Sequence, residues 1–255
     1  MTREQRLVFG EVAEDYARER PSYPDALVDD VVALAGGRDA LEVGAGTGKA
    51  TTAFAARGLR VTALEPSPEM AAVGRRLVPE AEWVVSGIEE FSSPARFDLI
   101  YAAQSWHWVE PERGFARAAE LLRPGGLLAL FWNRGQDGSG ALRRDLDAIY
   151  ARLAPELREG GGQGVDHAEA IRASGLFGEV EQRAYRWSDV RAAASYVRLL
   201  GTHSNHRMLP AERRAALQDA VARAIEAHGG AIEISYVTEL FAARPLAGAG
   251  ERPSG

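Results

Sequence analysis

The chain of 255 residues is long enough to bury a full hydrophobic core, and its 46% hydrophobic and 26% charged residues are typical of a globular protein. A formal net charge of −6 without any basic block disfavours nucleic acid as a partner, because phosphate binding relies on clustered Lys and Arg. The lack of cysteine excludes disulfides, thiolate metal sites and a cysteine nucleophile. The N-terminal residues lack the apolar core of a signal peptide and no apolar run could span a bilayer, so we expect a cytoplasmic protein with no membrane partner.

Over the first 133 residues, short apolar runs alternate with helical patterns. We predict strands at residues 39–44, 59–65, 81–87, 96–103 and 127–133. Glycine and proline signals predict helices at residues 47–58, 67–78 and 111–126, the second with Ser67 as its N-cap. Strands that alternate with helices need right-handed crossovers, which place helices on both faces of a parallel sheet. The sequence therefore predicts an open α/β fold.

The remainder of the chain is mostly helical. We predict helices near residues 140–157, 166–174, 189–200 and 210–228, and strands at residues 178–188 and 231–244. The two strands are expected to pair as an edge hairpin, with a helical cap of residues 188–229 inserted before the last strand. Ligands of open α/β sheets bind at the carboxyl ends of the strands, so a cap there would cover the site. We expect residues 1–255 to form a single domain.

The segment "LEVGAGTGKAT" places a glycine-rich turn between the first strand and the first helix of the sheet. Such a turn lets a ligand approach the backbone, and the helix N-terminus offers free N–H groups. The phosphate-loop pattern G-x-x-x-x-G-K-S/T does not fit, because Val43 and Ala50 stand at two of its defining positions. The dinucleotide pattern G-x-G-x-x-G fits poorly, because its third glycine would fall on Lys49.

The same segment resembles the first motif of the class I S-adenosylmethionine-dependent methyltransferases, an acidic residue followed by G-x-G-x-G. The matching residues are Glu42, Gly44, Gly46 and Gly48. "PSPEM", "SGIEEF" and "LLRPGGLLAL" resemble later segments of that family in the right order, so the resemblance covers about residues 8–133. It implies S-adenosylmethionine as the cofactor and a seven-stranded, mostly parallel, Rossmann-like sheet with helices on both faces.

The resemblance also assigns roles to individual residues. It places Glu65, at the end of the second strand, on the ribose hydroxyls, and Pro66 and Met70 beside the adenine. Gly87 and Ile88 would contact the adenine edge through their backbone, and Glu89 would accept from its exocyclic amine. Glu42 would contact the cofactor or orient the glycine turn through hydrogen bonds.

The N-terminal segment resembles a lid of the small-molecule branch of this family, and we expect residues 1–30 to form it. Tyr16 and Arg20 would meet the amino-acid end of the cofactor, because a phenol and a guanidinium can bind its carboxylate while excluding water.

The stretch "AAQSWHWVEP" follows the fourth predicted strand, and the resemblance places it beside the methyl donor. Ala103 and Gln104 would then contact the cofactor, and His107 is the candidate catalytic base. Ser105, Trp106, Trp108, His203 and Asn205 are the candidate acceptor-binding residues. We expect one of the two tryptophans to pack inward and the other to face the acceptor.

The implied reaction is in-line methyl transfer to a carboxylate, hydroxyl or amine of a small molecule. Only a hydroxyl or an ammonium acceptor must lose a proton, so the need for a base depends on the acceptor. No plausible metal cluster is visible among the five histidines. The alternatives are an NAD(P)-dependent oxidoreductase, which would usually show Tyr-x-x-x-Lys, and a non-catalytic cofactor-binding module.

Overall fold

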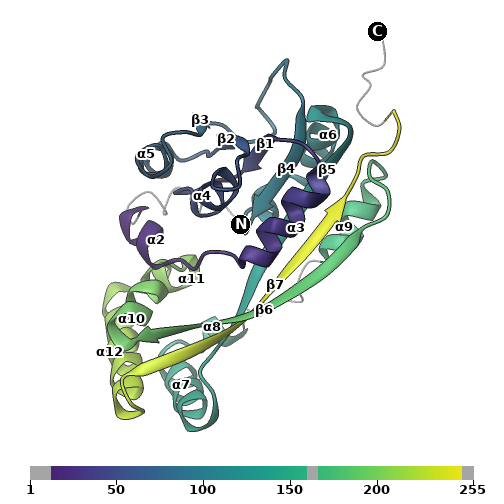
Figure 1. Ribbon diagram of the computed structural model, residues 1–255. Coiled ribbons are helices and arrows are strands. Elements are labelled where there is room, and N and C mark those ends of the chain that lie inside the picture. Colours follow the sequence, from purple (N-terminus) through teal and green to yellow (C-terminus); the bar gives the residue numbers. More distant parts are fainter. Residues whose placement is uncertain (1–12, 160–165, 249–255) are drawn as a thin grey trace.

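The computed structural model describes residues 13–159 and 166–248, so the first twelve residues of the predicted lid lie outside the described residues (Figure 1). A seven-stranded sheet has the order β3-β2-β1-β4-β5-β7-β6. The strands are β1 (Asp39–Val43), β2 (Arg60–Leu64), β3 (Glu82–Val84), β4 (Phe97–Ala103), β5 (Leu122–Asp137), β6 (Glu181–Ala192) and β7 (Ala231–Ala243). β1 to β5 pair in parallel, and β7 is antiparallel to both β5 and β6. This confirms the predicted mostly parallel sheet.

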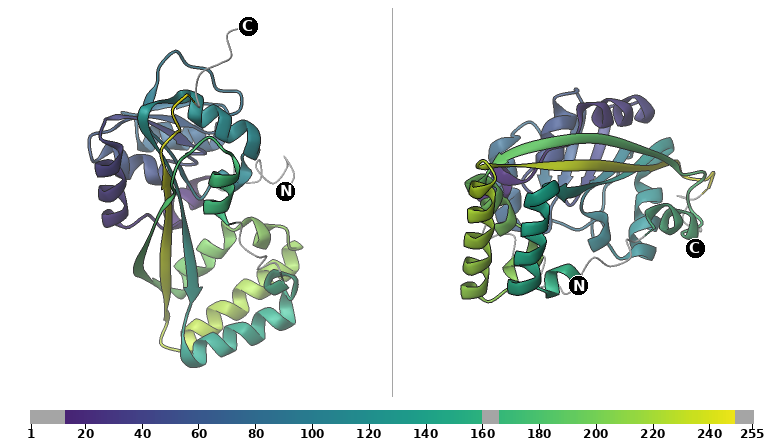
Figure 2. Two further views of the ribbon diagram at one scale, coloured as in Figure 1. Left: turned by 90° about the vertical axis from the view of Figure 1, so that its right-hand side faces the viewer. Right: turned by 90° about the horizontal axis from the view of Figure 1, so that it is seen from below.

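Helices cover both faces of this sheet (Figures 1 and 2). They are α2 (Ala13–Glu19), α3 (Asp25–Ala35), α4 (Lys49–Ala55), α5 (Pro68–Leu77), α6 (Pro111–Leu121), α7 (Gly140–Leu153), α8 (Glu156–Glu159), α9 (His167–Ala173), α10 (Ala193–Gly201), α11 (Ser204–Arg207) and α12 (Ala211–Ala227). Successive residues of a strand point to opposite faces, so Ile100 enters the core beneath α6 and α9 while Tyr101 enters the core beneath α3 and α4. The predicted cap of α5 is confirmed, because the Ser67 hydroxyl accepts from the Met70 N–H. Within the described residues, no helix has both the length and the apolar character needed to cross a bilayer.

Strands β5 and β6 extend beyond the ends that the pattern predicted. β5 continues past residue 133 because β7 pairs with it as far as Asp137 opposite Ile234. β6 runs to Ala192, which pairs with Ala231, so residues 188–192 belong to the strand and not to the predicted cap or its first helix. Pairing with β7 supplies backbone hydrogen bonds that a local pattern cannot show.

The extended ends of β5, β6 and β7 carry a group of helices, α7, α10, α11 and α12, which we call the helical unit (Figure 2). Its core joins Leu146 of α7 to Tyr196 and Leu199 of α10 and to Leu217 and Val221 of α12. The helical unit therefore extends beyond the predicted cap of residues 188–229, because α7 precedes β6 in the chain and packs against α12.

Candidate active site

The glycine-rich turn lies against the segment that follows β4. Gly44 has a φ of 70°, in the left-handed region that favours glycine. A Cβ at Gly44 would lie 2.6 Å from the Cβ of Ser105, so the close approach also requires glycine. The Ser105 hydroxyl donates to the carbonyl of Val43, which joins the turn and this segment into one wall of the site.

Glu65 follows the end of β2 and is anchored to the same turn. Its carboxylate accepts from the backbone N–H of Gly46 and of Ser67, each at 2.8 Å. Burial raises the pKa of this carboxyl, although the two N–H groups act in the opposite direction. A carboxylate has about four lone-pair positions, so two backbone hydrogen bonds leave capacity for a ribose diol.

A cavity of about 300 Å³ opens at this edge of the sheet. It is lined by fourteen of the predicted site residues: Tyr16, Arg20, Gly44, Gly46, Glu65, Pro66, Met70, Gly87, Ile88, Glu89, Gln104, Ser105, His107 and Trp108. Val43, Ser67, Val109 and Ser204 line it as well and were not predicted, although each is next to a predicted residue or motif. Segments from β1, β2 and β4 and from α2 and α11 therefore meet in one cavity, which we call the donor cavity.

Glu42 and Ala103 lie beside the donor cavity and not in its lining, and both face a small neighbouring cavity of about 40 Å³. The buried Glu42 carboxyl accepts from the Thr51 hydroxyl at 2.6 Å and from the Tyr101 hydroxyl at 2.8 Å. Burial raises its pKa to about 7. Of the two roles predicted for Glu42, these contacts support orientation of the turn.

Gly48 also lies outside the lining of the donor cavity. It precedes α4, and a Cβ there would lie 3.1 Å from a methyl of Val78 and 3.3 Å from the Trp83 ring. This glycine therefore serves the packing of the turn on the body of the sheet.

Gln104 turns the chain from β4 into the site. With a φ of 62°, it is the one non-glycine residue in the described ranges that has a positive φ. Its N–H donates to the carbonyl of Phe131 at 2.9 Å, and its side-chain amide donates to the carbonyl of Asn133 at 3.3 Å. Two hydrogen bonds to β5 thus hold a conformation that is costly for a residue with a side chain.

The structure separates the roles of the two tryptophans. Trp106 is 5% exposed and packs against Phe115 in the core, with ring centroids 5.2 Å apart. Trp108 lines the donor cavity. Trp106 is thus the inward tryptophan, and its predicted contact with the acceptor is not seen in the lining.

His107 is held in place by Trp132, which lies behind it on β5. Its Nδ1 is 3.3 Å from the indole Nε1 of Trp132 on β5. Trp132 in turn stacks on His167, with ring centroids 3.5 Å apart and planes 4° apart. Burial, with a smaller contribution from His167, lowers the pKa of His107 to about 4, so the ring is neutral at pH 7. An indole N–H can only donate, so Nδ1 is the acceptor and the proton of the neutral ring is on Nε2.

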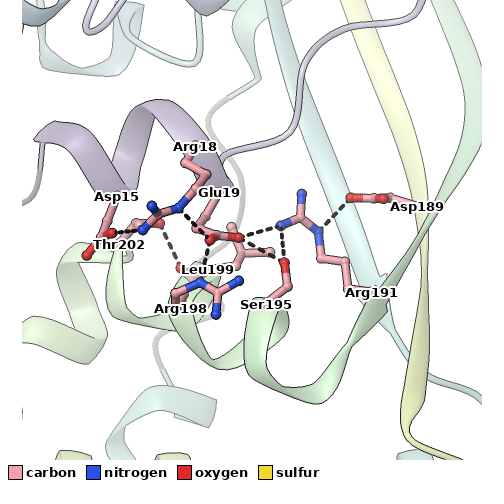
Figure 3. Close-up of polar contacts among 9 residues, drawn as sticks. All are labelled: Asp15, Arg18, Glu19, Asp189, Arg191, Ser195, Arg198, Leu199 and Thr202. Carbon is pink, nitrogen blue, oxygen red and sulfur yellow. Dashed lines mark hydrogen bonds and ion pairs between the residues drawn. The ribbon is translucent and has the colours of Figure 1, made fainter.

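Helix α2, within the described residues 13–30 of the predicted lid, rests against the helical unit. The Arg20 guanidinium lies 5.0 Å from the centroid of the Tyr16 ring and donates to the carbonyl of Thr202 at 2.9 Å. The Arg20 Nε is buried and has no hydrogen-bond partner among the described residues. Figure 3 shows the buried Glu19 carboxylate among Arg18, Arg191, Ser195 and Arg198.

The two predicted acceptor residues of the cap do not line the donor cavity. His203 and Asn205 line a separate cavity in the helical unit, whereas Ser204 between them lines the donor cavity. Among residues 13–159 and 166–248, no group of three or more His, Asp or Glu side chains is arranged to hold a metal ion.

A mostly parallel sheet, with a glycine turn after its first strand and a half-buried glutamate after its second, defines a Rossmann-like cofactor-binding protein. Residues 41–130 match the Methyltransf_11 family, described as a methyltransferase domain. An uncharacterized methyltransferase of Mycobacterium tuberculosis is 31% identical over 242 residues, which cover 92% of this chain and 95% of that protein. A solved protein of Anaeromyxobacter dehalogenans, assigned as a type II methyltransferase, is similar with a TM-score of 0.67 and 25% identity over 88% of this chain and 97% of that one.

A further relative is a trans-aconitate 2-methyltransferase of Delftia acidovorans, which is 36% identical over 121 residues, or 45% of each chain. The chain belongs to the class I S-adenosylmethionine-dependent methyltransferases. It is therefore an enzyme whose methyl donor is S-adenosylmethionine. This finding argues against the alternative of an NAD(P)-dependent oxidoreductase.

Proposed function

We propose that the enzyme transfers the methyl group of S-adenosylmethionine to a carboxylate of a small organic acid. The observation that carries this proposal is the hydrogen bond from the Trp132 indole to Nδ1 of His107. It leaves His107 with an N–H at Nε2, which can donate to an anion and cannot accept a proton. A pKa of about 4 also makes this ring a weak base near neutral pH.

The donor cavity has groups suited to each part of the cofactor. Glu65 offers carboxylate capacity toward the ribose, and Gly87, Ile88 and Glu89 line the part expected to hold the adenine. Tyr16 and Arg20 line the part expected to hold the amino-acid end. His107 and Trp108 would then border the acceptor, together with Val109 and Ser204.

S-adenosylmethionine supplies a methyl group on a sulfonium, and attack by a carboxylate oxygen forms a methyl ester as the C–S bond breaks and its electron pair remains on sulfur. A carboxylate is already an anion, so no proton has to be removed. The contribution of His107 would be to orient the carboxylate, and that of Trp108 to exclude water from its surroundings. The named substrate of the Delftia relative, trans-aconitate, is a carboxylic acid, which agrees with this class of acceptor.

The test is a panel of small carboxylic acids, phenols and amines, incubated with the enzyme and a donor that carries a labelled methyl group. We expect label in base-labile methyl esters of one or more acids. Label confined to phenols or amines would contradict the proposal, because those acceptors need a base that the Nε2–H form of His107 does not supply. A Glu65→Ala variant serves as the control for donor-dependent transfer.

A further inference from the structure

A second cavity, of about 600 Å³, lies in the helical unit. The short helix α11 borders both cavities, because Ser204 lines the donor cavity while Asn205 and His206 line the second one. The remaining wall comes from the end of β5, from α7 and α8 and from α10: Gly135, Asp137, Arg143, Leu146, Asp147, Tyr150, Leu157, Tyr196 and Leu200, with His203 before α11. A cavity of this size is within the range of small-molecule sites.

The charged groups of this cavity already have partners. Arg143 pairs with Asp147 at 2.8 Å and also donates to the backbone carbonyl of Asp137 at 3.3 Å. The Asp137 carboxyl interacts with the Tyr196 hydroxyl through a hydrogen bond, and burial raises its pKa. Because these charges are already paired or hydrogen-bonded, a charged ligand group would find no free partner among the described residues of this wall. An uncharged ligand group would therefore enter with the smallest desolvation free energy.

His206 supplies a polar group without a partner. The side chain is 4% exposed, its Nδ1 has no hydrogen-bond partner within residues 13–159 and 166–248, and its Nε2 is 3.3 Å from the Tyr150 hydroxyl. If Tyr150 donates to Nε2, then Nδ1 carries the free proton; if Nε2 donates to Tyr150, then Nδ1 is a free acceptor. A hydroxyl group both donates and accepts, so it would complete either arrangement.

We propose that this cavity binds the distal part of the acceptor, an uncharged apolar body that carries a hydroxyl group. The hydroxyl is bound by His206 and Tyr150, and the apolar body packs against Leu146, Leu157 and Leu200. This inference rests on the proposed function, because the carboxylate of the same acceptor would lie beside His107.

Calorimetry tests the inference without any methyl transfer. The enzyme, saturated with S-adenosylhomocysteine, is titrated with a 4-hydroxyphenylalkanoate and with the phenylalkanoate of the same chain length. We expect the hydroxyl to tighten binding about three- to tenfold, the usual worth of one hydrogen bond. His206→Phe and Tyr150→Phe should each reduce that preference to less than about twofold. His228→Phe is the matched control, because His228 lies outside this cavity and pairs with Asp145.

A cavity-filling variant provides the second measurement. Leu200→Trp should weaken binding of both compounds about tenfold or more, with the affinity for S-adenosylhomocysteine unchanged. Equal affinities of the two compounds in the parent enzyme, or a hydroxyl preference that survives both phenylalanine variants, would overturn the inference. If the enzyme forms methyl esters but binds the two compounds equally, the result supports the proposed function and contradicts this inference. If it prefers the hydroxyl compound but forms no methyl esters, the result supports hydroxyl binding in this cavity and contradicts the proposed function.

Discussion

Glu19 at the end of α2 accepts a hydrogen bond of 2.5 Å from Arg198 of α10, and the Glu19 side chain is 3% exposed. Ser195, one turn earlier on α10, donates to the same carboxylate at 2.8 Å. The contact joins α2 to the helical unit, and Tyr16 of α2 and the neighbouring Arg20 line the donor cavity. The position of α2 beside this cavity is therefore coupled to the packing of α10.

Glu19→Gln should loosen the packing of α2 on α10 and lower the free energy of unfolding in a pH-dependent way. Burial acts to raise the pKa of Glu19, but hydrogen bonds from Arg198, Ser195 and Arg18 outweigh it, so the net shift is downward. A lowered folded pKa contributes stability above the unfolded pKa of about 4.5, and this stability is lost as pH falls through the folded value. We expect the variant to lose about 1–3 kcal/mol at pH 7 and less near pH 4, measured by urea unfolding. An identical loss at both pH values would contradict this role of the charge.

Glu65→Ala should weaken binding of S-adenosylhomocysteine by at least about 1.5 kcal/mol, because it removes hydrogen bonds to a carboxylate and leaves ribose hydroxyls unpaired. Isothermal calorimetry measures the loss directly. Glu82→Ala, at an exposed glutamate of β3, is the matched control and should bind like the parent. Unchanged affinity in Glu65→Ala would remove Glu65 from the cofactor site.

His107→Gln should retain most of the activity toward a carboxylate, since the glutamine amide can still donate, whereas His107→Ala should lose about tenfold. The rate profile of the parent enzyme should stay flat from pH 6 to 9, because the pKa of about 4 keeps His107 neutral throughout this range. A base would behave differently, with a loss of about 10²-fold or more that shrinks at high pH. Parallel donor binding measurements show whether either substitution disturbs the cofactor.

Trp132→Phe tests the hydrogen bond from the Trp132 indole to Nδ1 of His107. Without the indole N–H, Nδ1 of His107 loses its donor, and the ring is free to change tautomer. We expect the nitrogen NMR signals of His107 to show a proton on Nε2 in the parent and a mixture in the variant. A parent ring protonated on Nδ1 would contradict the carboxylate-orienting role.

Gly44→Ala should abolish donor binding and destabilise the fold by more than about 1 kcal/mol. Gly36→Ala is the matched control, because Gly36 has a similar φ of 68° and nothing within 4 Å of the added Cβ, whereas the Cβ at Gly44 would lie 2.6 Å from Ser105. The difference between the two losses, measured by thermal unfolding, reports the contact with Ser105 separately from backbone strain. Equal losses would show that the contact contributes nothing.

The order of the strands and the identity of the cofactor could be predicted from local sequence features. A strand that ends in Gly44 and another that ends in Glu65 are local features, and parallel strands bring their carboxyl ends to one edge wherever the crossovers run. Fourteen of the predicted site residues consequently line one cavity. Local periodicity also located most of the helices and the final two strands, because it depends on which face of each element is apolar, but it did not predict α3 or α11.

Which side chains of each motif face the cavity depends on contacts between elements that are distant in the chain. Trp106 and Trp108 are chemically alike in sequence, and the packing of one against Phe115 leaves the other for the cavity. The proton position on His107 depends on Trp132, which is brought beside it by the pairing of β4 with β5. In the same way, α7 joins the helical unit through contacts with α12 that are distant in the chain. Contacts of this kind are set by how whole elements pack, and a local pattern carries no information about its partner.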